Sequence, residues 1–391
     1  MAAAILSVLV RSVGRDNGIS ARRHDKSGRS AAWNRPFSAH GRSEIIMPFY
    51  VFGGSNSIFR DGWVSSFSQQ TGQPVLNRSV GATTTLTGLF RFLMPGDGDQ
   101  PGEGDCVLWE YALNEVNHVA RGYRREMLLK NVEHLMALCR ARGCRFVPLI
   151  LTPLWQERAP QRDPYYQMLT DLFAHHGIVP FDVSVAWRQR NAGQRLPYAL
   201  YTDSAHYTRA PELTAFIAAG VAELVAACRV PAPVAPLHTA GRSVALVEGL
   251  TQGWHENALM RIPTAQLPLS IELNGHGRVA AVCALCHADF ESGIRVQLQR
   301  DADQMRQMRF STTNSSHRRV ILKAVSLENA LGKRWDTHWL FGPGDRLLLS
   351  PARHPGEFYA EHELRSTLTM PEEKTPARIA GVLLENVTPA C

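Results

Sequence analysis

The sequence predicts a three-layer α/β fold, a parallel sheet with helices on both faces, followed by a smaller antiparallel β-sandwich-like domain. Two observations lead to this prediction. Between residues 49 and 229, short strand-like runs alternate with helical patterns, which is the order of a parallel sheet covered on both faces. After residue 242, short strand-like runs are divided by Gly, Asn, Pro and Asp, which is typical of a sandwich.

The elements of the first domain follow from their periodicity. Residues Leu128, Val132, Leu135 and Cys139 recur at helical spacing and predict one amphipathic helix. Apolar residues between 213 and 225 predict the last helix of the domain in the same way. The strands are expected at 49–52, 74–76, 106–111, 145–151 and 178–181.

The domain boundaries follow from a change in composition. The proline-rich stretch "RVPAPVAPLHTAGR" cannot continue the preceding helix and favours an extended linker. Beyond it, runs such as "RVAAVCALC" and "RIAGVLLENV" predict strands. We therefore expect a disordered basic extension at 1–46, an α/β domain at 47–230, a linker at 231–242 and a β-rich domain at 243–391.

Composition and charge exclude several classes of protein. The chain has 391 residues, of which 45% are hydrophobic and 20% charged, as in ordinary globular proteins. Much of its net charge of +7 lies in the first 46 residues, so the body has no basic face for nucleic acid. No apolar run approaches the length of a membrane span. A cleaved targeting segment is the alternative for the extension.

The seven cysteines predict reduced thiols and a cytoplasmic location. Their number is odd, their spacing is irregular, and several lie in apolar runs. A disulfide framework would show an even number at regular spacing. The oligomeric state is not indicated by the sequence.

Four stretches place polar side chains after strands or before the last helix. "FGGSNS" puts Ser55 in a glycine-rich turn after the first strand, and "NRSVGATT" offers Gly81 after the second. "WEYALNE" offers Asn114 after the third strand, and "YTDSAH" sets Asp203 three residues before His206. Because ligands bind at the carboxyl ends of parallel strands, we expect these residues to meet at one edge.

These residue types suit nucleophilic catalysis. A serine hydroxyl needs a base, and a histidine can accept its proton near neutral pH. An aspartate then orients the imidazole, while backbone N–H groups and an amide can stabilise an oxyanion. Each residue also has a plainer interpretation. Asp203 and His206 can be a helix-capping pair, Asn114 a turn residue, Glu115 a solvated or structural acid, and Ser57 a helix-start residue.

Over about residues 48 to 229, the four stretches resemble the motif blocks of the SGNH/GDSL hydrolase family. The resemblance implies a flavodoxin-like sheet and a triad of Ser55, His206 and Asp203. It also implies an oxyanion hole formed by the N–H of Ser55, the N–H of Gly81 and the amide of Asn114. The sequence departs from the family at three positions: Gly54 replaces the Asp of Gly-Asp-Ser, and Ala112 and Glu115 replace the Gly and the last Asp of Gly-x-Asn-Asp.

The resemblance implies a serine esterase that removes small, acetyl-like groups from a glycan through an acyl-Ser55, without a cofactor. A polysaccharide O-acetyltransferase would use the same site, and a glycan-binding protein without activity is a third alternative. The partners expected are an acylated small molecule or glycan, with no nucleic acid. Aromatic residues of the second domain, with Trp335 and Trp339 as weak candidates, can bind sugar or pack in the core.

"CALCH", residues 283–287, matches the pattern of c-type haem attachment. The flanking sequence predicts a strand, on which Cys283 and Cys286 point to opposite faces. We therefore expect core cysteines here and no metal.

Overall fold

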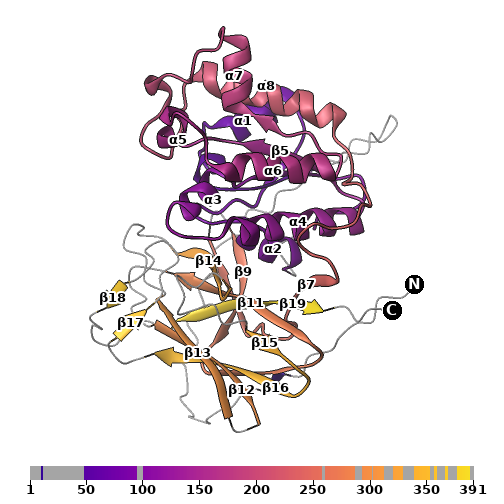
Figure 1. Ribbon diagram of the computed structural model, residues 1–391, viewed down its shortest axis with the longest axis vertical. Helices are drawn as coiled ribbons and strands as arrows, with labels where there is room; N and C mark the ends of the chain where they lie inside the picture. The colour runs from indigo at the N-terminus through magenta and orange to yellow at the C-terminus, as the bar shows by residue number, and fades with distance from the viewer. Residues whose placement is uncertain are drawn as a thin grey trace, which may run out of the picture.

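The computed structural model describes residues 10–11, 48–94, 100–257, 260–286, 293–301, 303–311, 320–328, 339–352, 356–358, 366–368 and 377–387. Figure 1 shows the two predicted parts, with a helix-covered sheet in the upper half and antiparallel strands in the lower half. The α/β part precedes the β-rich part along the chain, as expected.

The upper sheet is parallel throughout. Its spatial order is β3-β2-β4-β5-β6, and along the chain this is the 2-1-3-4-5 order of flavodoxin-like folds. Strands β2 and β4 are buried along their whole length because both faces of the sheet are covered. The flavodoxin-like prediction is confirmed. The strands are β2 (Phe49–Gly53), β3 (Val75–Asn77), β4 (Cys106–Glu110), β5 (Arg145–Ile150) and β6 (Phe181–Asp182).

Helices cover both faces of this sheet. One face packs against α1 (Trp63–Thr71) and α8 (Pro211–Ala227), and the other packs against α2 (Thr85–Leu93), α4 (Arg125–Ala141) and α6 (Pro164–His175). Both predicted amphipathic helices, now α4 and α8, are confirmed. In the described part of the chain, no helix has the length and apolar character to cross a membrane. The shorter helices are η1 (Ser55–Ser57), α3 (Ala112–Val119), α5 (Leu154–Arg158), α7 (Val183–Arg190) and η2 (Tyr198–Leu200).

The β-rich part contains two larger antiparallel sheets that share one core, as the sandwich prediction requires. The first has the order β1-β10-β16-β12-β13, and the second has β14-β11-β19-β9-β8 with β7 and β15 attached. A small pair, β17 (Gly356–Phe358) and β18 (Ser366–Leu368), is separate. The other strands are β1 (Val10–Arg11), β7 (Arg242–Leu246), β8 (Gly253–Glu256), β9 (Arg261–Gln266), β10 (Leu269–Leu273), β11 (Gly277–Cys286), β12 (Gly293–Arg300), β13 (Asp303–Ser311), β14 (Ile321–Ser326), β15 (Leu340–Phe341), β16 (Asp345–Ala352) and β19 (Arg378–Val387).

Two residues of the N-terminal extension lie in a strand that joins the β-rich part. Val10 and Arg11 form β1, which pairs antiparallel with Ile271 and Ser270 of β10. Without β1, β10 would be the edge strand of its sheet, and its outer backbone N–H and C=O groups would have no strand partner. Pairing with β1 provides that partner. The rest of the 1–46 stretch lies outside the described residues.

Helix α2 lies between the parallel sheet and the β-rich part. The ring of Phe90 packs so closely on β19 that a Cβ at Gly381 would lie 2.8 Å from its Cε2 atom, so this strand position requires glycine. The Oγ1 of Thr87 accepts a hydrogen bond from the N–H of Ala324 at 3.3 Å. Since buried residues of both parts belong to one continuous core, packing fixes the β-rich part against the α/β part.

The proline-rich linker is also fixed to the α/β part. The Glu133 carboxylate on α4 accepts backbone N–H groups from Leu237, His238 and Thr239 at 2.7–2.8 Å. Burial raises the pKa of Glu133, but the bonds from His176 and these N–H groups outweigh it and lower the pKa to about 2. An ionised carboxylate therefore ties the linker to α4.

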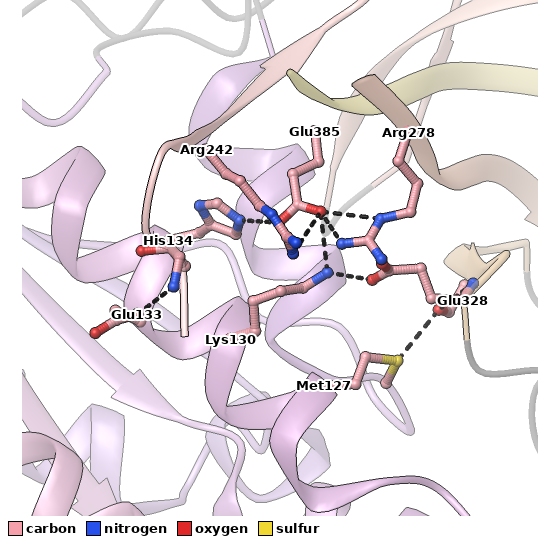
Figure 2. A network of polar contacts seen from close by, with 10 residues as sticks. Met127, Lys130, Glu133, His134, Arg242, Arg278, Glu328 and Glu385 are labelled. Carbon is pink, nitrogen blue, oxygen red and sulfur yellow. Dashed lines mark hydrogen bonds and ion pairs between the residues drawn. The ribbon is translucent and has the colours of Figure 1, made fainter. Parts of the chain in front are cut away.

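Figure 2 shows a second ionic contact between the two parts. The buried carboxylate of Glu385, on β19, receives Lys130 at 3.3 Å, His134 at 2.8 Å and Arg278. Burial raises the pKa of Glu385, but the bond from His134 and the charges of Lys130 and Arg278 hold it well below its usual range. Glu328 pairs with Lys130 and Arg278 beside it.

Candidate functional site

The site begins in the turn that ends β2. Gly54 follows the strand in extended conformation, and Ser55 starts the short helix η1. The carboxylate of Glu110, at the end of neighbouring β4, accepts the N–H of Gly54 at 3.1 Å and the hydroxyl of Ser57 at 2.7 Å. Ser57 is thus a buried anchor at the end of η1 rather than the residue that starts a helix. These two bonds fix the turn through Gly54 and Ser57, and neither of them uses the hydroxyl of Ser55.

Ser55, His206 and Asp203 form a continuous chain of hydrogen bonds. The Oγ of Ser55 lies 2.8 Å from the Nε2 of His206, and the Nδ1 of His206 lies 2.7 Å from the Oδ2 of Asp203. Ser55 and His206 are 151 positions apart in the sequence. The structure therefore brings together the three residues that were predicted to act as a triad.

Asp203 also organises its own loop. Its Oδ1 accepts the backbone N–H groups of Ala205 and His206 at 2.8 and 2.9 Å. Burial raises the pKa of Asp203, but these bonds and the contact with His206 outweigh it and lower the pKa, which favours the carboxylate. The capping alternative for this pair is wrong, because α8 begins at Pro211 and its N-cap Ala210 has no side-chain cap.

Asn56 joins the serine turn to the histidine loop, and the sequence interpretation missed it. Its Nδ2 donates to the carbonyl of Ala205 at 3.0 Å, and its Oδ1 accepts the N–H of Tyr207 at 2.9 Å. These two bonds flank His206 on either side. The available signal was an asparagine directly after the candidate nucleophile, but its burial and its partners were unknown without the fold.

Three hydrogen-bond donors lie at the serine turn: the backbone N–H of Ser55 itself and two donors from neighbouring segments. Within the described residues, the backbone N–H groups of Ser55 and Gly81 donate to no protein acceptor. A Cβ at Gly81 would lie 3.6 Å from the Cβ of Ser55, so the two residues are neighbours. The next residue, Ala82, has a φ of 57°, a left-handed conformation that is rare outside glycine and is found at functional loops.

Asn114 supplies the third donor from α3. Its Nδ2 donates to the carbonyl of Thr83 at 2.8 Å, and the second hydrogen of that amide stays available. The turn interpretation of Asn114 is wrong, because the residue lies within a helix. A Cβ at Gly54 would lie 2.5 Å from this Nδ2, so the close approach of Asn114 explains why position 54 is glycine here.

Glu115 holds the loop that Asn114 contacts. It is fully buried, so the solvated interpretation is wrong and the structural one holds. Its Oε1 accepts the N–H of Thr85 at the start of α2 at 3.0 Å, and its Oε2 accepts the hydroxyl of Tyr165. Burial raises the pKa of Glu115 to about 7, although both bonds act in the opposite direction. Glu115 therefore fixes Thr85, two residues after the Thr83 carbonyl that Asn114 contacts.

Glu110 is the second residue that the sequence interpretation missed. It is fully buried beneath the serine turn, and this burial raises its pKa to about 7 against the lowering effect of Ser57 and Gly54. It reads as a strand residue in "CVLWEY", with no sign of its role.

The candidates of the β-rich part do not join this site. Trp339 is a wrong candidate for sugar binding, because it is buried in the core and exposes only 2% of its surface. Trp335 and His287 lie outside the described residues. Cys283 and Cys286 are buried on β11, as expected, and the described residues contain no cluster that could hold a metal ion.

The fold and the site define an α/β protein with a flavodoxin-like sheet and a hydrogen-bonded chain of serine, histidine and aspartate side chains. No family model and no curated protein matches the chain. Solved structures do match, and several of them are described as members of the GDSL family or as GDSL-like lipases.

One match is a member of the lipolytic G-D-S-L family from Veillonella parvula. It is 13% identical, covers 46% of this chain and 97% of the other, and has a TM-score of 0.36. An acetyl xylan esterase is 14% identical over 45% of this chain and 98% of its own, with a TM-score of 0.37. A Bacillus subtilis protein is 14% identical, and the chain spans 56% of its length, with a TM-score of 0.34. The function proposed below therefore rests on the geometry of the site.

Proposed function

We propose that the protein is a serine esterase that removes small, acetyl-like groups from a glycan. The observation that carries this proposal is the hydrogen-bond chain from Ser55 through His206 to Asp203, with unused N–H donors beside Ser55. A histidine at 2.8 Å from a serine hydroxyl is within reach to take its proton.

The reaction follows from the positions of these groups. The Oγ of Ser55 attacks the ester carbonyl while His206 takes the hydroxyl proton. The carbonyl oxygen becomes an oxyanion, which the N–H groups of Ser55 and Gly81 and the amide of Asn114 stabilise. Asp203 holds the imidazole in the tautomer with hydrogen on Nδ1 and stabilises the imidazolium.

The second half of the reaction returns the enzyme to its starting state. His206 gives its proton to the departing alcohol oxygen, which leaves an acyl group on Ser55. A water molecule then attacks the acyl carbonyl as His206 removes its proton. The bond between the acyl carbon and the Oγ of Ser55 breaks, His206 returns the proton to Oγ, and the carboxylic acid departs. If a sugar hydroxyl takes the place of water, the same acyl-enzyme performs acetyl transfer.

A labelling experiment tests the nucleophile. The wild-type protein is incubated with a fluorophosphonate probe and, separately, with p-nitrophenyl acetate. We expect both labelling and turnover, and we expect Ser55→Ala to abolish them. Ser65→Ala, a half-buried serine on α1, is the matched control and should behave as wild type. Labelling that persists in Ser55→Ala would exclude Ser55, and an inert wild type would favour the glycan-binding alternative.

Product analysis decides between hydrolysis and transfer. The enzyme is incubated with an O-acetylated oligosaccharide, with and without an excess of unacetylated oligosaccharide. The products are then identified by mass spectrometry. Hydrolysis gives free acetate in both reactions. Acetyl groups that appear on the added oligosaccharide would identify a transferase.

A further inference from the structure

An exposed tryptophan lies at the rim of the candidate site. Trp155 is in α5, which begins four positions after the last residue of β5, and 40% of its surface is exposed. In Figure 1, α5 and α3 lie at the same end of the parallel sheet. A tryptophan side chain is usually more deeply buried. An exposed indole beside a reaction site is therefore a candidate surface for binding a ligand.

Two hydrogen bonds connect α5 to the loop that carries His206 and to the helix that carries Asn114. The N–H of the preceding residue, Leu154, donates to the carbonyl of Ser204 at 3.0 Å, within the loop that carries Asp203 and His206. The Nε1 of Trp155 donates to the Oδ1 of Asn117 at 2.8 Å. Asn117 follows the oxyanion donor Asn114 by three residues on α3, so both lie on the same side of the helix.

The surroundings of Trp155 are open and polar rather than enclosed and apolar. Asp203 and Ser204 are exposed, and the side chain of His206 is 31% exposed. The amide of Asn117 lies at the N–H edge of the indole, and its Nδ2 carries two further N–H donors. A flat aromatic face beside an amide suits a sugar ring, whose C–H groups meet the negative face while its hydroxyls bond at the edge. A long acyl chain would need an enclosed apolar cavity.

We propose that Trp155 is the stacking platform for the sugar ring that bears the scissile ester, with Asn117 holding the indole in place. This proposal rests on the esterase function proposed above. The bond to Asn117 fixes the ring before substrate binds, so little side-chain freedom is lost on binding. Trp155 thereby selects an acylated sugar over a simple acyl ester.

The test compares two kinds of substrate in one set of variants. The substrates are p-nitrophenyl acetate, which has no sugar, and a panel of O-acetylated xylo-, cello- and manno-oligosaccharides. We expect Trp155→Ala to lower kcat/KM on the best oligosaccharide roughly 10-fold more than on p-nitrophenyl acetate. Trp155→Phe keeps an aromatic face and should recover part of the loss. Equal losses on both substrates would overturn the proposal.

Trp254 provides a matched control in the β-rich part. It is 39% exposed, and the guanidinium of Arg261 lies over its ring at 4.5 Å. Trp254→Ala should leave kcat/KM on both substrates unchanged. If Trp254→Ala rather than Trp155→Ala lowers activity on the oligosaccharide, the platform lies on the β-rich part and the proposal is wrong.

A binding measurement separates failure of this proposal from failure of the esterase function. Calorimetry on Ser55→Ala with the same oligosaccharides should show binding that Ser55→Ala/Trp155→Ala weakens roughly 10-fold. Turnover of p-nitrophenyl acetate by wild type without oligosaccharide binding would overturn the platform and leave the esterase standing. A selective effect of Trp155→Ala on p-nitrophenyl octanoate would assign the indole to the acyl chain instead.

Discussion

Replacement of Glu110 by glutamine should change how the stability of the protein depends on pH. Glu110 is fully buried beneath the serine turn, and burial raises its pKa from 4.5 to about 7. The folded state therefore binds a proton at this site between about pH 4.5 and 7, where the unfolded chain has released it. In that range the free energy of unfolding falls as the pH rises.

The magnitude follows from the size of the shift. A rise of about 2.5 pKa units corresponds to about 3 kcal/mol, which the wild type loses between pH 4 and pH 8. Glutamine cannot ionise, so Glu110→Gln lacks this loss while its amide oxygen can still accept from Ser57 and Gly54. Glu115 has a similar shift, but it is present in both proteins and cancels in their difference.

Urea unfolding at several pH values between 4 and 8 measures this difference. We expect Glu110→Gln to gain about 3 kcal/mol relative to wild type across the range. Glu223→Gln, on the exposed side of α8, removes the same charge without burial and should show no such trend. A difference between Glu110→Gln and wild type that stays constant with pH would refute the assignment of a raised pKa to this carboxyl.

Three further predictions concern the site and the interface between the two parts. Asn114→Ala should lower kcat on p-nitrophenyl acetate about 10²–10³-fold with little change in KM, because the lost donor acts on the oxyanion; a higher KM at unchanged kcat would contradict this role. Asn56→Ala removes both bonds that flank His206 and should slow fluorophosphonate labelling at least about 10-fold, and labelling at the wild-type rate would contradict its positioning role. Glu385→Ala should destabilise the protein by about 3 kcal/mol or more in urea, because it leaves the buried cations Lys130 and Arg278 with only one of the two carboxylates that they share. Glu256→Ala, an exposed glutamate paired with Arg261 at 3.9 Å, is its control and should cost less than about 1 kcal/mol; similar unfolding midpoints for the two variants would contradict the prediction.

Several features were predictable because local patterns determine them. The strands of the parallel sheet follow from short apolar runs, and α4 and α8 follow from helical periodicity. The parallel order then implies that the ends of the strands share one edge, which brings Ser55, Gly81 and Asn114 together. Asp203 and His206 bond across only three residues, so their pairing could also be inferred from spacing.

Other features depend on contacts between distant segments. Glu110 looks like any strand residue until the fold places it under Ser57, 53 positions earlier in the chain. Asn56 bonds to a loop 149 residues away, and Glu133 holds a linker more than 100 residues later. The sequence also drew attention to tryptophans of the β-rich part, whereas the exposed indole at the rim is Trp155.

By itself, the order of residues in this chain determined an α/β part followed by a β-rich part, and it indicated the groups that we propose to react. Periodicity and spacing are local properties, and they are enough to specify strands, helices and the ends of strands. Only the tertiary structure decided which side chains support those groups, which carboxyls have raised pKa values and which tryptophans are exposed. Burial and long-range hydrogen bonds depend on the packing of segments that are far apart in the sequence, and no local pattern encodes them.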